Sequence, residues 1–349
     1  MILPQSYPAV LFLMILSLFF LGSWASAYKF AGWWRFELFY FDFAIGLLLA
    51  AVIYAFTVGN LGYDGFSFVD DLQHAGKRQW MYGFMAGMVF NLGNMLLMAA
   101  VSVAGMSVAF PMTMGIALLL GTGLGVAGRP AGNTLLLGLG CALILTSTIV
   151  NAVLYRIMGV AQHEALARSG HAKSTRRPSP VKGIILALVA GLLIGSCTPL
   201  LDKARIIDVG LGPYALTALF AFGVFFSTFV FNIFFMNLPV EGEPVDFGSY
   251  FSGSGKQHLL GFAAGVVWCT GILAAMVSSS VPEQMQAAPL TRYLLLEGAP
   301  VLAALWGILV FREFKSRDVR VIALGMLMIA LFVCGLVMVG LAPIYLRKV

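Results

Sequence analysis

The chain has 349 residues, of which 60% are hydrophobic and only 10% are charged. Soluble domains carry about 25% charged residues, so this composition excludes a protein whose surface faces water throughout. A net charge of +6 would suggest nucleic acid as a partner of a soluble protein. Here the basic residues lie between apolar runs, so we expect the lipid bilayer with its anionic headgroups as the partner, and no nucleic acid.

Ten apolar runs follow one another, each long enough to cross a bilayer, which takes about 20 residues. They are 8–28, 38–59, 80–103, 106–127, 133–157, 182–201, 211–237, 258–279, 288–311 and 319–341. The first run ends near Ala25-Ser26-Ala27, as a signal peptide would, but no Lys or Arg precedes it. We therefore keep it as a helix and predict an all-α membrane protein with ten transmembrane helices.

The longest basic connection, 158–181, separates two groups of five predicted helices. Cytoplasmic connections are enriched in Lys and Arg, and the connections on the side of this segment hold the larger share of them. We expect a cytoplasmic linker, both termini outside, and a multi-pass protein of the cell membrane, the inner membrane of a bacterium. The predicted units are a first repeat at 1–157, the linker at 158–181 and a second repeat at 182–349.

The third and eighth helices share a sequence pattern. Residues 83–93 align without gaps on residues 261–271, with six identities in eleven positions. In the first and sixth helices, Gly22-Ser23 similarly corresponds to Gly195-Ser196. Because the offset of five helices is odd, the two halves would cross the membrane in opposite senses, as inverted repeats do in alternating-access transporters. Chance similarity between glycine-rich apolar helices is the alternative.

Several short motifs occur in a fixed order over the whole chain. They are Leu21-Gly22-Ser23-Trp24, Phe41-Asp42-Phe43 with 48–57, Asn91-Leu92-Gly93-Asn94, Ala299-Pro300, and 306–311 with Glu313. This order resembles the drug/metabolite transporter superfamily and, within it, the ureide permease family; the Gly-Ser-Trp feature is also found in glucose/ribose porter-type sugar transporters. The resemblance implies two inverted five-helix bundles and proton-coupled movement of a small polar nitrogenous or sugar-like solute.

One departure from that family concerns nucleotide binding. Plant ureide permeases carry a phosphate-loop-like motif in the central connection, whereas residues 169–175 here lack its Gly-Lys pair and first glycine. Residues 252–257 contain Gly-Lys without a following Ser or Thr. Neither segment forms the full phosphate cradle, so we expect no cofactor and no use of ATP. The four cysteines lie in apolar runs without metal-ligand spacing, which predicts no metal site.

Glu297, near the middle of the ninth helix, is the strongest candidate for chemistry. Charged groups inside a membrane are costly and usually face a cavity or a partner. Burial favours the neutral carboxyl, so such a group can exchange protons near neutral pH and couple proton movement to substrate binding. Pro300 frees a backbone carbonyl one turn earlier. The alternative is a permanent ion pair, for example with Arg292.

Other polar and aromatic side chains predict a substrate site at the third and eighth helices. Asn91 and Asn94 share a helix face, and amides offer both donors and acceptors to a neutral polar solute. Trp268 and Thr270 lie at the equivalent level of the eighth helix, where an indole can stack on a planar ring. We add Trp24 as a pocket wall and Thr113 as a hydroxyl, while interhelical hydrogen bonding and core packing are the alternatives.

The resulting hypothesis is a secondary active transporter, and not an enzyme, that moves a ureide, nucleobase or similar metabolite, with protons as the coupling ion. A sugar transporter or a multidrug or metabolite exporter of the same fold is the alternative, and a homodimer is compatible with it. A membrane-embedded enzyme acting on lipid would need a polar catalytic cluster. The nearest is Asp70-Asp71 with His74, Lys77 and Arg78, which fits no catalytic pattern and is better explained by a short solvated loop.

Overall fold

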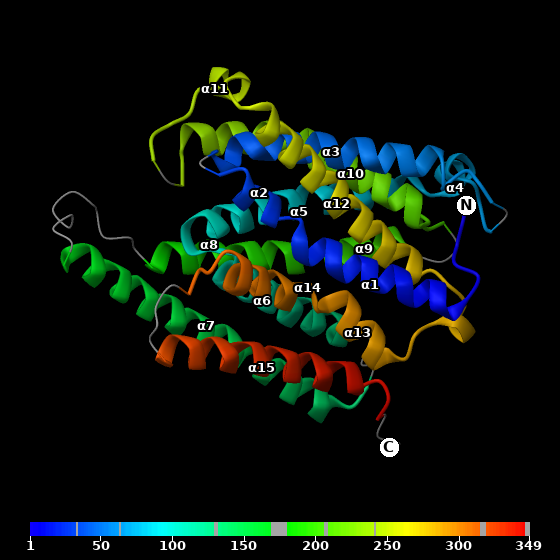
Figure 1. Cartoon of the computed structure of the whole chain (residues 1–349). Helices are drawn as coiled ribbons and strands as arrows, with labels where there is room; N and C mark the ends of the chain where they lie inside the picture. The colour runs from blue at the N-terminus through cyan, green and yellow to red at the C-terminus, as the bar shows by residue number, and fades with distance from the viewer. Residues whose placement is uncertain are drawn as a thin grey trace.

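The structure is a computed structural model that describes residues 1–32, 34–62, 64–128, 132–168, 180–205, 209–240, 242–314 and 319–345, and these residues form helices without any strand (Figure 1). The first half contains α1 (Tyr7–Ser23), α2 (Ser26–Phe30), α3 (Phe36–Phe56), α4 (Phe68–His74), α5 (Lys77–Ala104), α6 (Met106–Gly128) and α7 (Thr134–Arg168). The second half contains α8 (Pro180–Gly195), α9 (Thr198–Ala204), α10 (Pro213–Asn237), α11 (Gly248–Phe251), α12 (Gly255–Ser278), η1 (Glu283–Met285), α13 (Pro289–Glu297), α14 (Ala299–Leu305), η2 (Trp306–Val310) and α15 (Val319–Leu341).

Each of the ten predicted apolar runs is helical. Among the described residues, eight helices are long and apolar enough to cross a membrane. The count rises to nine if the bent pair, α13 with α14 and η2, forms a single span. The first run contains α1, an apolar helix of 17 residues. Helices suit a bilayer because they satisfy every backbone hydrogen bond within one segment. The protein is thus a multi-pass helical membrane protein, while ten spans remain a prediction.

One helix is longer than the sequence predicts. Helix α7 continues to Arg168, well beyond the apolar run that ends at residue 157, because residues 161–168 are rich in Ala, Glu, Gln and Leu, which favour helix even where the pattern becomes polar. Residues 169–179 of the predicted linker, including the loop compared with a phosphate-binding motif, lie outside the described residues.

Three of the apolar runs are broken into two helices. The first breaks between α1 and α2 at Trp24, and the sixth between α8 and α9 just before Pro199. The ninth bends by 43° between α13 and α14, next to Gly298 and Pro300. Proline lacks the N–H that continues a helix, so the last two breaks follow directly from the sequence. Broken helices free backbone groups near the middle of a membrane, which is tolerated only where protein or a cavity surrounds them.

The tightest helix crossings occur in equivalent places of the two halves. A Cβ on Gly46 of α3 would meet the carbonyl oxygen of Phe262 on α12, and a Cβ on Gly265 of α12 would meet that of Phe43. The crossing of α10 with α5 repeats this arrangement, with Gly223 against Phe84 and Gly87 against Phe220. Small residues allow such close approach in membranes. Helix α10 lies five apolar runs after α3, and α12 lies five after α5, so each helix of one crossing has its counterpart in the other.

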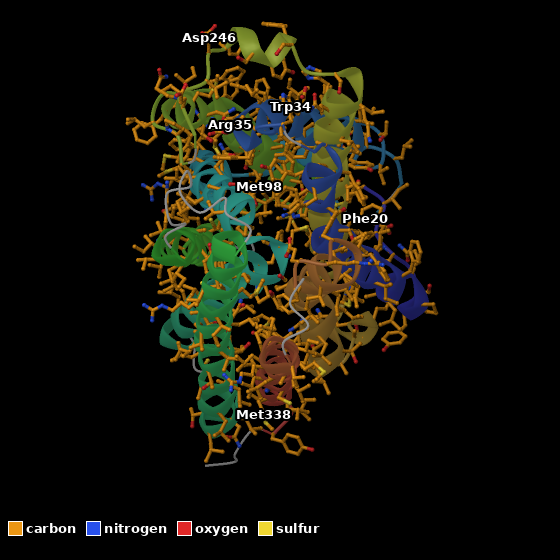
Figure 2. All side chains as sticks on the ribbon, turned by 60° about the vertical axis from the view of Figure 1, so that its left-hand side comes forward. Phe20, Trp34, Arg35, Met98, Asp246 and Met338 are labelled. Atoms are coloured by element: carbon orange, nitrogen blue, oxygen red, sulfur yellow. The ribbon has the colours of Figure 1, made fainter. Side chains whose placement is uncertain are left out.

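Other contacts also recur with this offset. Helix α1 packs on α12 as α8 packs on α5, and α13 packs on α15 as α6 packs on α7. The buried core lies where α3, α5, α10 and α12 meet, around large side chains such as Phe39, Tyr40, Phe43, Met95 and Met98. The outer faces carry mainly apolar side chains, with few nitrogen or oxygen atoms among them (Figure 2).

The bundle has two distinct ends. The start of α1 and the end of α15 lie at one of them, which we call the termini end (Figure 1). The other, which we call the linker end, is where α7 ends and α8 begins. At the linker end the ammonium of Lys182 on α8 donates to the carbonyl oxygen of Val240, just after α10. The long helices run between these two ends (Figure 1).

Candidate functional site

A cavity of about 300 Å³ lies between the two halves of the chain. Four of the predicted site residues line it: Trp24 after α1, Asn94 on α5, Trp268 on α12 and Glu297 at the end of α13. They are far apart in sequence and come from four different apolar runs. The broken helices place residues at the cavity too, since Cys197 and Thr198 line it at the break before α9.

Sequence reasoning missed several lining residues that the repeat itself could have identified. The sequence offset pairs Trp24 with Cys197, and it pairs Trp268 with Phe90. All four line the cavity, as do the equivalent pairs Leu21 with Ile194 and Leu97 with Ala275. Applying the offset to each predicted residue would therefore have found Cys197 and Phe90. The cavity receives equivalent positions from both halves.

Aromatic rings form much of the cavity wall. The rings of Trp268 and Phe220 are stacked, with centroids 5.7 Å apart and planes at 14°, and Phe90 lies 4.8 Å from the same indole. On the other side, Trp24 packs against Phe110 at 6.2 Å. Neither indole N–H donates a hydrogen bond within the described part of the chain. Such walls can stack on a planar solute and donate to it from the ring edge.

Glu297 has no ion-pair or hydrogen-bond partner among the described residues. Arg292, the partner considered from sequence, instead donates from Nη1 to Oε1 of Gln286 at 3.2 Å. The lining residues of the cavity in the described part of the chain include no other acidic and no basic side chain. A lone carboxyl among aromatic and aliphatic side chains is costly to ionise without a counter-ion. This arrangement suits a group that takes up a proton or a substrate donor.

Asn91 and Asn94 have different surroundings although they share a helix face. Asn91 is fully buried: its Oδ1 accepts from Tyr40 at 2.9 Å, and its Nδ2 donates to the hydroxyls of Ser227 and Thr228 at 2.8 and 3.1 Å. Asn94 lines the cavity, and its Nδ2 donates to the Tyr40 hydroxyl at 3.0 Å. Asn91 therefore takes part in interhelical bonding.

Thr113 and Thr270 are not among the residues that line the cavity. Thr113 is fully buried on α6, and its hydroxyl has no hydrogen-bond partner in the described structure. The Thr270 hydroxyl lies 2.8 Å from the hydroxyl of Tyr54 and donates to the carbonyl of Val266. The structure thus brings four of the seven predicted residues together and places Asn91, Thr113 and Thr270 in the helix packing around them.

Glu313 joins three segments at the linker end. Its carboxylate accepts from the backbone N–H groups of Met106 and Ser107, at 2.9 and 2.8 Å, and from the Ser107 hydroxyl at 2.6 Å. Lys29 on α2 pairs with it at 3.1 Å. An anion at a helix N-terminus is favoured by the exposed N–H groups and the helix dipole. Glu313 thereby ties α2 and the end of η2 to the start of α6.

Asp42 on α3, part of the Phe41-Asp42-Phe43 motif, forms a second cluster at the linker end. It is 6% exposed, and its two oxygens accept from the hydroxyl of Tyr250 at 2.5 Å and face Nδ1 of His258 at 2.8 Å. The ring of Trp34 packs edge-on to His258 at 4.8 Å. No short-range signal links Asp42 with partners more than 200 positions away, so sequence reasoning could not assemble this cluster.

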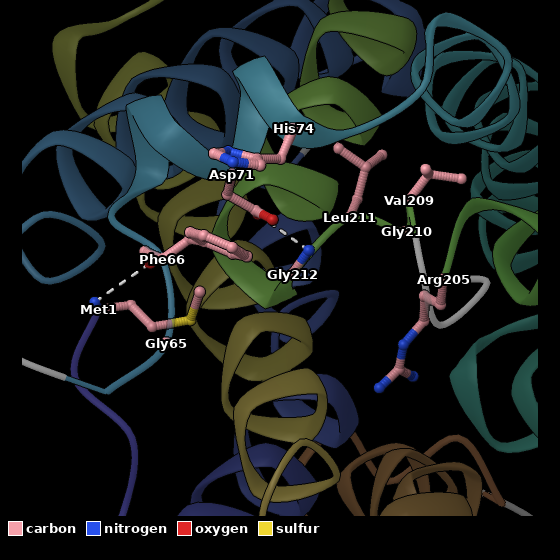
Figure 3. Close-up of a pocket in the computed structure, with 10 residues that line it drawn as sticks. All are labelled: Met1, Gly65, Phe66, Asp71, His74, Arg205, Val209, Gly210, Leu211 and Gly212. Carbon is pink, nitrogen blue, oxygen red and sulfur yellow. Dashed lines mark hydrogen bonds between the residues drawn. The ribbon is translucent and has the colours of Figure 1, made fainter.

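A separate hollow of about 270 Å³ lies at the termini end (Figure 3). There the N–H of Gly212 donates to Oδ2 of Asp71 at 2.9 Å, and the ring of Phe66 stacks on His74 with centroids 4.4 Å apart. Burial raises the pKa of the Asp71 carboxyl above its ordinary value. The other acid of the predicted cluster, Asp70, accepts from the Ser67 hydroxyl at 2.6 Å. These groups hold the connection around α4 in place.

Comparisons with known proteins agree with a transport role. The ureide permease family model matches residues 39–180. Ureide permease 1 of Arabidopsis thaliana is 22% identical over 375 residues, which cover 92% of this chain and 93% of that protein. Ureide permease 2 of the same plant is 24% identical over 357 residues, covering 84% and 86%.

A solved structure, described only as a crystal structure of a protein, matches with a TM-score of 0.54 at 16% identity. It covers 95% of this chain and 98% of its own, and it bears on the fold alone. The sequence relatives and the apolar helices together support kinship with the ureide permeases. These relatives support a membrane transporter of small metabolites.

Proposed function

We propose that this protein is a secondary active transporter that binds a small polar solute, such as a ureide or nucleobase, in the cavity between its halves. The observation that carries the proposal is that Trp24, Asn94, Trp268 and Glu297, from four different apolar runs, line one cavity. The sugar transporter and the multidrug exporter remain alternatives within the same fold. The names of the two plant relatives, ureide permeases 1 and 2, favour the ureide.

Alternating access between two inverted halves is the proposed mechanism. It is supported by the equivalent glycine crossings of α3 with α12 and of α5 with α10, and by the equivalent residue pairs that line the cavity. Two halves of similar packing have two arrangements of similar energy, one open to each membrane face. The solute site between them then faces one side at a time.

Glu297 is the proposed proton-coupling residue. It is the only ionisable carboxyl that lines the cavity in the described residues, and it has no counter-ion there. A proton on Glu297 removes the cost of a buried charge, and a bound solute that donates a hydrogen bond stabilises the ionised form. The two events are thereby coupled through one group, whichever direction the solute moves.

Uptake by purified protein in liposomes tests this proposal. We expect radiolabelled allantoin or uracil to accumulate when a pH gradient is imposed, while a sugar and an organic cation in parallel arms test the two alternatives. Glu297→Gln should lower gradient-driven accumulation by at least about tenfold, because a neutral amide takes up no proton. It should still exchange solute across the membrane at equal pH.

Glu283→Gln provides the matched control, since Glu283 is an exposed carboxyl outside the cavity. It should transport like the unmodified protein. Gradient-driven accumulation that survives in Glu297→Gln would remove this residue from coupling. Absence of uptake in every arm would count against the transport proposal itself.

A further inference from the structure

A chain of hydrogen bonds runs from the backbone of α10 to the cavity. The hydroxyls of Ser227 and Thr228 lie next to Nδ2 of Asn91, whose Oδ1 lies next to the hydroxyl of Tyr40. The same hydroxyl of Tyr40 lies next to Nδ2 of Asn94. Tyr40 itself is fully buried on α3 and is not among the residues that line the cavity.

The α10 end of this series determines which group donates and which accepts in every hydrogen bond. The Ser227 and Thr228 hydroxyls spend their single hydrogens on carbonyl oxygens of α10, Gly223 at 2.7 Å and Val224 at 2.8 Å respectively. They can therefore only accept from Asn91, which must present its Nδ2 to them. Its oxygen then faces α3.

The same logic continues to Asn94. Because Asn91 presents an oxygen, the Tyr40 hydroxyl must donate its one hydrogen there, and its own oxygen can then only accept. Asn94 consequently turns its Nδ2 toward Tyr40. A reversed amide would place two acceptors against each other in a buried site, which costs the desolvation of both groups.

The amide oxygen of Asn94 is therefore left for the cavity. It accepts no hydrogen bond from the described residues, and it is not one of the fully enclosed polar atoms without a partner. A bound solute must supply a donor at this point, because an acceptor placed there would face the oxygen without a shared hydrogen. Besides Asn94, the side chains that carry oxygen at the cavity wall are those of Thr198 and Glu297. An ionised Glu297 can only accept hydrogen bonds, so it also calls for a donor on the solute.

We propose that Tyr40 is a positioning residue that sets the selectivity of the cavity, by holding Asn94 as an acceptor that recognises an N–H donor of the solute. This inference rests on the proposed transport function for the identity of the site. It assigns a role in solute recognition to a residue that never touches the solute. It also gives Asn91, outside the cavity, an indirect role in what binds inside it.

A pair of matched probes tests the inference by apparent affinity in thermal-shift titrations of the detergent-purified protein. Hydantoin presents two N–H donors, and 1,3-dimethylhydantoin presents none. The unmodified protein should prefer hydantoin by about tenfold or more, as expected when a buried acceptor is left without a partner. Tyr40→Phe frees the Asn94 amide to reverse and donate to a carbonyl, so the preference should shrink to within about threefold.

Tyr214→Phe is the matched control, since Tyr214 is a buried tyrosine whose hydroxyl donates to the Ile2 carbonyl, away from the cavity. It should lower stability without changing the preference between the probes. A merely structural role of Tyr40 would also leave that preference unchanged. An unchanged preference in Tyr40→Phe, in a protein that binds hydantoin, overturns the inference.

A measurement without solute separates this inference from the proposed function. Asn91→Ala and Asn94→Ala should have non-additive effects on the thermal unfolding midpoint, because Tyr40 connects the two amides. In the Tyr40→Phe background the two effects should add. If the unmodified protein binds neither probe, the proposed ureide site is wrong. Independently of that result, additive effects of Asn91→Ala and Asn94→Ala in the presence of Tyr40 would overturn the series of hydrogen bonds.

Discussion

At the scale of single residues, Asp71 illustrates how an acidic side chain near the membrane surface can serve structure. It is 5% exposed, and one of its oxygens accepts from the N–H of Gly212 at the start of α10. Burial raises the pKa of its carboxyl, partly opposed by that hydrogen bond and by His74. The folded protein therefore binds a proton at Asp71 more tightly than the unfolded chain does.

This shift predicts a specific pH dependence of stability. Protonation of Asp71 contributes to the free energy of unfolding. This contribution is complete below the ordinary Asp pKa of about 3.9 and is lost as the pH rises through the raised pKa of the folded state. Asp71→Asn keeps an oxygen for Gly212 and removes the titration, so it should unfold at a temperature equal to or above that of the unmodified protein at pH 7. Thermal unfolding in detergent measures the difference in unfolding temperature between the two proteins, which should shrink as the pH falls to 4. A difference that widens would contradict the raised pKa of Asp71.

At the scale of elements, glycines determine how closely the central helices approach. The crossing of α5 with α10 places Gly87 against the Phe220 carbonyl and Gly223 against the Phe84 carbonyl. A methyl group at either position would meet backbone rather than a flexible side chain, so the helices themselves would have to separate. The crossing of α3 with α12 has the same construction, and both lie beside the cavity.

Gly87→Ala should therefore destabilise the protein by about 1–3 kcal/mol, the usual cost of overpacking, and widen the cavity wall at Phe220. Gly138→Ala is the matched control, because a Cβ at Gly138 on α7 meets nothing within 4 Å. It should be neutral or stabilising by up to about 1 kcal/mol, since alanine favours helix. Thermal unfolding of the two variants side by side gives the comparison, and equal midpoints would refute the close crossing.

At the scale of the whole molecule, ionic contacts are unequally distributed. The ion pairs Lys29–Glu313 and Arg35–Glu37 and the hydrogen-bonded Asp42–His258 contact, found among the described residues, all lie at the linker end. In the second half, Lys203 on α9 lies over the ring of Tyr82 at 5.5 Å. The cavity lining also reaches the last turns of α9 and α12 at the termini end. We infer a state closed at the linker end.

Glu313→Gln should favour opening at that end, because the amide loses the ion pair with Lys29 and one acceptor for the start of α6. Cys197 in the cavity reports the change when Cys141, Cys269 and Cys334 are replaced by Ala. In vesicles of known orientation, an impermeant maleimide applied from the linker side should label Cys197 about tenfold faster in Glu313→Gln, equivalent to about 1.4 kcal/mol of shifted equilibrium.

The control for this measurement is Asp246→Asn, which changes a charge at an exposed position of the same end. It should leave the labelling rate unchanged. Faster labelling in both variants would indicate a general effect of surface charge. An unchanged rate in Glu313→Gln would show that Glu313 does not hold this end closed.

The sequence alone determined the helical elements and several residues of the cavity. Helix positions were predictable because a segment in lipid must satisfy its own backbone hydrogen bonds, so apolar length suffices. Glu297 was predictable because a charged group inside an apolar run needs a cavity or a partner. The sequence offset between residues 83–93 and 261–271 also pairs Trp268 with Phe90, and the offset between Gly22-Ser23 and Gly195-Ser196 pairs Trp24 with Cys197.

Only the tertiary structure decided which polar groups share surroundings. Asn91 and Asn94 look alike in sequence, but the rotation of α3 inserts Tyr40 between them, so one amide is used for packing and the other faces the cavity. Asp42 meets Tyr250 and His258 because α3 and α12 cross closely. The physical reason is that helix rotation and crossing depend on the sum of many distant side-chain contacts, which no local pattern contains.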